Sequence, residues 1–180
     1  MSSVLARIPQ AARLVDEAAR LDFLHCDAVQ VRGPLSVLQA YCAMTSDIPA
    51  WLSSAFRIRD FISRRFNVAD IHGFSHRTPD TVPKVGEQLD FFTVEGISEH
   101  QLVLTARDTH LAVMVCMDLT PTRDADAEGA AMRLSVTTSV KRYNVFGRLY
   151  MLPVAPTHGP IVKRMLRNVV ATFPPPTPIR

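Results

Sequence analysis

The stretch that decides the fold is Met132-Arg-Leu-Ser-Val-Thr-Thr-Ser-Val-Lys-Arg-Tyr-Asn144, which is followed by a second apolar stretch at residues 159–173. Apolar and polar residues alternate in the first stretch, which predicts a strand with one face in the core and the other in water. The second stretch has a helical pattern. Because Pro153 and Pro156 precede it, we expect the uninterrupted helix to begin near Gly159. The two stretches predict a sheet that is closed by a C-terminal helix.

Other strands are expected upstream, at residues 23–31, 89–95, 101–107 and 110–119. Ser36 is a suitable N-cap for a short helix over residues 37–44, and a second helix is expected over residues 48–66. This order of strands and helices is typical of the α+β class, in which an antiparallel sheet has its helices on one side.

The expected strand at residues 110–119 is apolar on both faces, which indicates that both faces are covered. One cover would be the C-terminal helix. The other would be residues 1–21, which have a weak helical pattern and could form a helical arm, or a second subunit, which would make the protein a homodimer.

Size and composition indicate one globular domain over residues 1–180, with an extended tail at residues 174–180. No apolar run approaches the roughly 20 residues that a membrane-spanning helix needs. The N-terminus lacks the pattern of a secretory signal, so we expect a cytoplasmic protein.

The net charge of +3 is uneven, because all 17 Asp and Glu residues precede Gly129 and 8 of the 20 Lys and Arg residues follow it. The basic residues are scattered, so a solvated face is favoured over a nucleic-acid surface. Three cysteines lie far apart, and His72 and His76 lack a nearby third ligand. We therefore expect no metal site and no cofactor.

Candidate catalytic groups are Asp108 and His110 at a predicted hairpin turn, and His158 before the last helix. A carboxylate can orient a histidine for acid–base work, but Asp108 can equally serve the turn by accepting backbone N–H groups. Curvature of the sheet around the helix would leave a cavity for an apolar ligand. The residues expected to line it are Trp51, Arg107, Val113, Val115, Leu134, Val136, Tyr150 and Met165.

Several short motifs resemble those of the domain of unknown function 2867 family: Val145-Phe-Gly-Arg-Leu-Tyr150, Pro156-x-His158 with Ile161-Val-x-Arg-Met-Leu-Arg167, Asp108-x-His110-Leu111, and Trp51 with Phe56-Arg-x-Arg-Asp60. That family is similar to the helix-grip proteins, which include polyketide cyclases and START-like lipid-transfer domains. The resemblance implies a curved antiparallel sheet wrapped around a long C-terminal helix.

The chain departs from the family pattern at two places. Ala106 and Arg107 stand where a glycine and an acidic residue are expected, and Gly159 follows His158 where a bulkier residue is usual. Because the family has no established reaction, the resemblance implies a fold only.

Three hypotheses about function remain. The leading hypothesis is a binding protein for a small hydrophobic molecule. The alternatives are an enzyme of cyclase or isomerase type that uses His110 or His158 as acid or base, and an interaction module without a pocket.

Overall fold

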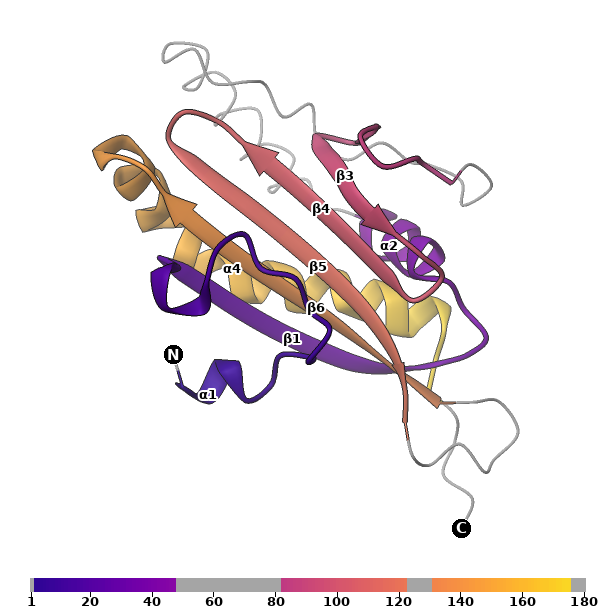
Figure 1. Cartoon of the computed structure of the whole chain (residues 1–180). Coiled ribbons are helices and arrows are strands. Elements are labelled where there is room, and N and C mark those ends of the chain that lie inside the picture. Colours follow the sequence, from indigo (N-terminus) through magenta and orange to yellow (C-terminus); the bar gives the residue numbers. More distant parts are fainter. Residues whose placement is uncertain (1, 48–81, 123–130, 176–180) are drawn as a thin grey trace.

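The computed structural model describes residues 2–47, 82–122 and 131–175, and its centre is one curved antiparallel sheet (Figure 1). Six strands lie in the order β1-β6-β5-β4-β3-β2. Their bounds are β1 Phe23–Arg32, β2 Gln88–Leu89, β3 Phe92–Ile97, β4 Gln101–Arg107, β5 Leu111–Pro121 and β6 Ala131–Arg142. The α+β class is confirmed. The expected helix at residues 48–66 with Trp51, and His72 and His76, lie outside the described residues.

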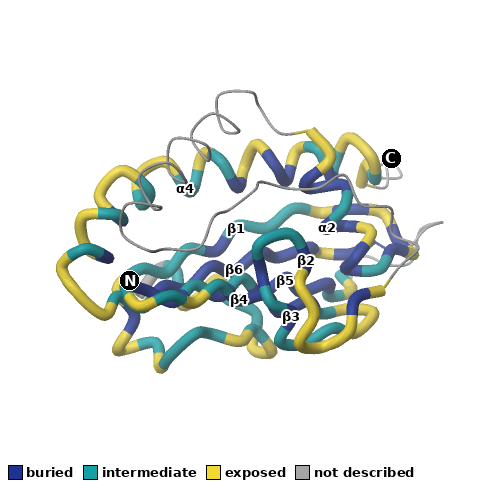
Figure 2. Tube along the Cα trace, turned by 90° about the horizontal axis from the view of Figure 1, so that it is seen from above, coloured by how far each residue is buried: buried dark blue, intermediate teal, exposed yellow. Residues whose placement is uncertain are grey.

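The sheet has helices on one face and the N-terminal segment on the other (Figure 2). Helix α4, Val145–Thr172, lies along β1 and β6, and helix α2, Val37–Thr45, packs against it and against β4 and β5. Ser36 caps α2 as predicted and forms a capping box with Gln39. A curved antiparallel sheet with a long C-terminal helix on it is consistent with the helix-grip architecture.

The strand expected over residues 89–95 is instead two strands, β2 and β3, joined by a tight turn. Leu89 pairs with Phe92 across that turn, and Asp90 has a φ of 56°. Asp and Asn tolerate this left-handed conformation better than other residues with a side chain. The hydroxyl of Tyr41 on α2 donates to the Asp90 carboxylate and ties the hairpin to the helix layer.

The expected start of the last helix near Gly159 is wrong, because α4 already begins at Val145. Three prolines lie inside it, at positions 153, 156 and 160, and all three are exposed. A proline leaves the carbonyl four residues earlier without its helical donor. Those carbonyls belong to Leu149, Leu152 and Pro156, which are also exposed. Water can therefore replace the missing bonds, and the helix continues.

Asn144 supplies the start signal of α4. Its side-chain oxygen accepts a hydrogen bond from the Gly147 N–H at 3.1 Å, and its amide donates to the Thr109 carbonyl at 3.1 Å. Gly147 lies against the β4–β5 turn, where an added Cβ would come within 2.4 Å of the His110 carbonyl oxygen. Because an added Cβ would clash there, a glycine at 147 allows this close contact between the helix start and the turn.

The main core lies between the sheet and the C-terminal half of α4. Leu134, Val136 and Met117 from the sheet pack there with Met165 and Leu166 from the helix, and all five are buried. A second, smaller cluster lies beneath the N-terminal half of α4, around Leu111, Val140 and Met151.

The polar face of β6 does not meet water as expected. Ser135, Thr137 and Ser139 are at most 1% exposed, and the N-terminal segment lies on this face of the sheet (Figure 2). The Val15 N–H donates to Ser139 Oγ at 2.9 Å. Small hydroxyl side chains leave room for this main chain, and Ser139 supplies an acceptor to it. Thr137 instead donates to the sulfur of Cys26, and Ser135 Oγ has no partner. The alternating pattern is the same whether this face is covered by water or by backbone.

The same segment covers the second apolar face of β5. Met114 and Cys116 are buried against Ala12 and Val15, and the Arg13 N–H points to the sulfur of Cys116 at 3.3 Å. The segment is not the expected helical arm. It contains only the short helix α1, Ser2–Leu5, and the 3₁₀ turn η1, Ala18–Arg20. Because the chain covers this face itself, the face no longer indicates a second subunit.

Candidate functional site

The Asp108 carboxylate serves the β4–β5 turn. Its Oδ1 accepts hydrogen bonds from the backbone N–H groups of His110 and Leu111 at 2.7 and 2.9 Å. Arg107 pairs with Glu95 at 3.3 Å. This pair lies on the face covered by the N-terminal segment, opposite the helices, because Glu95 also faces Arg13.

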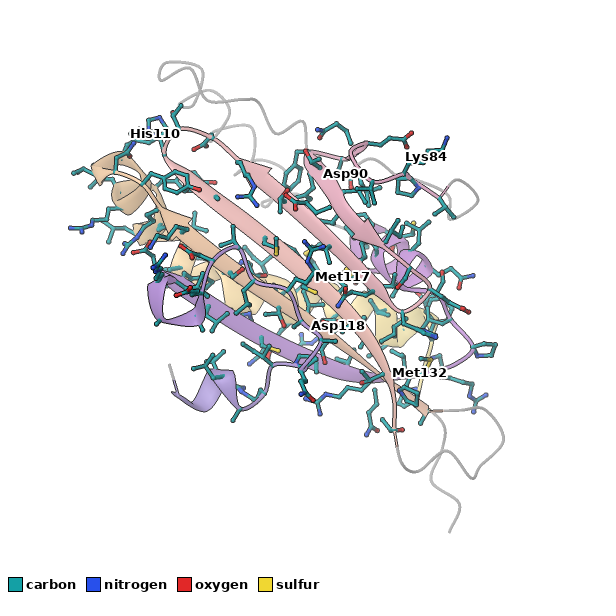
Figure 3. All side chains as sticks on the ribbon, in the orientation of Figure 1. Lys84, Asp90, His110, Met117, Asp118 and Met132 are labelled. Atoms are coloured by element: carbon teal, nitrogen blue, oxygen red, sulfur yellow. The ribbon has the colours of Figure 1, made fainter. Side chains whose placement is uncertain are left out.

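His110 is part of the β4–β5 turn and lies beside the start of α4 (Figure 3). Its ring centroid is 4.4 Å from that of Phe146, and its Nδ1 lies beside the Asn144 side chain. These contacts join the turn to the helix start.

Six of the residues predicted to line a ligand cavity divide into two groups by burial. Leu134, Val136 and Met165 are buried in the main core. Val113, Val115 and Tyr150 are only partly buried, and they pack at the edges of the two clusters. Because the main core is filled by side chains, a ligand would find space near the N-terminal half of α4.

Three polar side chains meet between β1 and the middle of α4. His25 and Asp27 come from β1, where their spacing of two places them on the same, helix-facing side, and His158 comes from α4. His25 Nε2 lies 3.2 Å from Asp27 Oδ2. The rings of His25 and His158 meet edge to face with their centroids 5.2 Å apart. We call these three residues the β1–α4 polar cluster.

The surroundings of the β1–α4 polar cluster are largely apolar. The Phe23 ring lies 5.4 Å from His158, edge to face. Gly159 lets the helix approach the strand, since a Cβ there would lie 3.3 Å from His25 Nε2. A larger residue at position 159 would therefore press on the His25 ring.

Three atoms of the β1–α4 polar cluster are buried and have no hydrogen-bond partner: His25 Nδ1, Asp27 Oδ2 and His158 Nε2. The 3.2 Å approach between His25 and Asp27 lacks the alignment of a hydrogen bond. An unsatisfied buried polar atom costs about 1–3 kcal/mol. Buried polar atoms normally have hydrogen-bond partners, and a bound water or ligand would explain three unsatisfied atoms in one place.

Burial keeps both imidazoles uncharged near neutral pH. It lowers the pKa of His158 to about 4, with a smaller contribution from His25. Burial also lowers the pKa of His25, while the Asp27 carboxylate opposes that shift and Lys163 and Arg7 add to it. The cluster therefore combines two neutral rings with one carboxylate.

A small pocket of about 180 Å³ adjoins the polar cluster through Phe23. Its other lining residues are Asp22, Arg142, Arg148, Met151, Leu152 and Ala155. Asp22 accepts two bonds from Arg142, one from the guanidinium and one from the backbone N–H, each 2.7 Å long. Burial alone would raise the pKa of Asp22, but the bonds and charge of Arg142 lower it.

The sequence did not single out His25 and Asp27. The available signal was their position on the otherwise apolar face of a strand, together with Phe23, Val29 and Val31. Only the packing of α4 reveals that His158 reaches the same place.

In the described part of the chain, no group of three His, Cys, Asp or Glu side chains, the β1–α4 polar cluster included, is arranged so that it could hold a metal ion. Within the same residues, no helix has the length and hydropathy to cross a membrane.

Comparison with curated proteins and with solved structures gave no match. A family model described as a protein of unknown function, DUF2867, matches residues 17–165, which include β1, the whole sheet and α4 as far as Met165. The Asp108-x-His110 turn, the helix start at Val145 and all three residues of the β1–α4 polar cluster fall within that match. The chain belongs to the DUF2867 family.

Proposed function

We propose that the protein binds a small, largely apolar molecule that carries a hydroxyl group, between β1 and the N-terminal half of α4. One observation carries the proposal: three polar atoms of the β1–α4 polar cluster are buried without partners. A ligand that satisfies them gains bonds that the free protein lacks.

A hydroxyl group suits the chemistry of the cluster. It can donate to Asp27 Oδ2 or to the lone pair of a neutral imidazole, and it can accept from an imidazole N–H. A carboxylate ligand would instead meet the Asp27 carboxylate, and the two negative charges would repel each other.

The apolar body of the ligand would pack against the smaller cluster. Phe23, Val113 and Val154 are partly buried there and remain available for contact. Leu134, Val136 and Met165 already fill the main core, so the C-terminal half of α4 is an unsuitable place for a ligand.

Pairs of ligands that differ only in the hydroxyl group test the proposal. We would measure binding of 1-naphthol and farnesol, and of their methyl ethers, by isothermal titration calorimetry and native mass spectrometry. We expect the alcohols to bind and the ethers to bind at least about tenfold more weakly, since each ether lacks the donor.

Variants localise the binding. His158→Phe keeps an aromatic ring against Phe23 and removes the nitrogen, so it should weaken binding of the alcohol and leave binding of the ether unchanged. The exposed His100→Asn is the matched control. Equal affinity for alcohol and ether, or an unchanged affinity in His158→Phe, would refute the proposal.

A second candidate is an enzyme of cyclase or isomerase type, favoured by the convergence of two histidines and a carboxylate. A neutral imidazole beside a carboxylate can act as a general base. In this version the base is His25 or His158 and not His110, whose contacts are with the start of α4. Exchange of solvent deuterium into the α-carbon of an added cyclic ketone, abolished in His25→Phe, is the test.

The third hypothesis, an interaction module without a pocket, is less favoured because part of its expected docking surface is covered. That hypothesis takes the strand that is apolar on both faces, residues 110–119, as the docking face, and the N-terminal segment packs on Met114 and Cys116 on one of those faces.

A further inference from the structure

We propose that the pocket formed by Phe23, Arg142, Arg148, Met151, Leu152 and Ala155 binds a small organic anion, a carboxylate with a short apolar chain. This pocket adjoins the β1–α4 polar cluster and shares Phe23, Met151 and Ala155 with the smaller apolar cluster. The groups that would bind the anion, Arg142 and Arg148, have no part in the function proposed above.

The charge around the pocket favours an anion. Arg142 and Arg148 both line it, and Asp22 is the one carboxylate among its lining residues. Asp22 occupies one Nη of Arg142 at 2.7 Å, while Arg142 Nε has no partner. The exposed Arg148 has no ion-pair partner among the described residues.

The wider surroundings strengthen this positive potential. Strand β6 and helix α4 contain no Asp or Glu at all, so no acidic side chain of these two elements neutralises the arginines. Within the residues that the structure describes, the Arg148 guanidinium has no ion-pair partner and the Arg142 guanidinium is only partly paired, against the single carboxylate of Asp22. Guanidinium groups bind carboxylates through paired N–H donors, and a shallow site lined by two of them attracts anions.

The remaining walls of the pocket are apolar. Met151 is buried, Ala155 is small, and Leu152 is 69% exposed, which is unusual for a leucine on a helix that packs against a sheet. Phe23 supplies an aromatic wall. A volume of about 180 Å³ suits a few methylene groups beside one charged head, and not a drug-sized molecule.

The test uses butanoate, hexanoate and octanoate as probes, followed by methyl ¹³C and amide ¹⁵N NMR of the full chain. We expect saturable shifts at the methyl groups of Met151, Leu152 and Ala155, and an affinity that rises with chain length. Because exposed charges are screened by salt, raising the ionic strength should weaken binding. The uncharged 1-hexanol should bind here more weakly than hexanoate.

Charge variants of two arginines on α4 test whether Arg148 contributes to binding of the anion. Arg148→Gln should weaken hexanoate binding about fivefold, which is typical of one exposed charge contact, and Arg148→Glu should weaken it further. Arg167, also exposed on α4 but outside the pocket, supplies the matched controls Arg167→Gln and Arg167→Glu, which should leave the affinity unchanged. Ala155→Phe should fill the pocket and abolish the shifts.

Absence of saturable shifts with all three acids would overturn the proposal. So would equal losses in the Arg148 and Arg167 variants, which would indicate a general effect of net charge. Neither result affects the hydroxyl site, because that site is tested with uncharged ligands and with variants of His158.

Discussion

Acidification should destabilise the protein through His158, whose ring is buried between β1 and α4. Burial lowers its pKa from 6.5 to about 4 in the folded state. A histidine with a depressed pKa binds its proton more readily in the unfolded chain. Its contribution to stability is therefore complete above pH 6.5 and is lost as the pH falls toward 4.

The magnitude follows from the two pKa values. Between pH 7 and pH 4.5, the change from 6.5 to about 4 corresponds to a loss of about 2.5 kcal/mol in the free energy of unfolding. His25 adds to the loss in the same pH range, because its pKa is also lowered. The pKa values of Asp22 and Glu95 are lowered as well, from 3.8 and 4.5, so most of the stability that these carboxylates contribute is lost below pH 4.5.

The assay is urea unfolding, followed by far-ultraviolet circular dichroism at several pH values between 7 and 4.5. His158→Phe cannot be protonated at this position, so its free energy of unfolding should fall much less over that range than that of the wild type. His100→Asn, at an exposed position, should keep the wild-type dependence. A full pH dependence in His158→Phe would contradict the assignment of this loss to His158.

Three further predictions concern the elements that hold the site in place. Gly147→Ala should cost about 1–3 kcal/mol in urea unfolding, because the new Cβ meets the His110 carbonyl oxygen. Asn144→Ala should lower the free energy of unfolding by about 1 kcal/mol through loss of the helix cap. An unchanged free energy of unfolding and an unchanged helical circular dichroism signal would contradict the role of Asn144 as the cap. Burial raises the pKa of the Cys116 thiol to about 12, and deleting residues 2–17 should expose this thiol. Its reaction with a thiol reagent should therefore become much faster. An unchanged rate would mean that the N-terminal segment does not cover Cys116.

The sheet was largely predictable because strand patterns depend on local alternation. The strands at residues 101–107 and 23–31 lie close to their expected bounds, and the capping box at Ser36 is a local signal of the same kind. The turn at Asp90 was missed because a single polar residue between Leu89 and Phe91 also fits the alternation of one continuous strand.

The start of α4 was missed for a physical reason. Prolines at 153 and 156 predict a broken helix, and whether the helix breaks depends on where the freed carbonyls point. The freed carbonyls here belong to Leu149, Leu152 and Pro156, which are exposed and can bond to water.

The candidate site was only partly predictable. His158 was singled out, but its partners His25 and Asp27 are distant in sequence and come together with it through the packing of α4 on β1. Asp108 and His110 attracted attention because they form a motif, yet their contacts explain the turn and the helix start.

The central claim is that the β1–α4 polar cluster contacts a ligand. Its most direct test is the imidazole ¹⁵N spectrum of the protein with and without farnesol or 1-naphthol. We predict that the ring nitrogen resonances of His25 and His158 move on saturation with the alcohol, while those of His100 stay in place. Binding that leaves both resonances unmoved, or no binding of either alcohol, would contradict the claim.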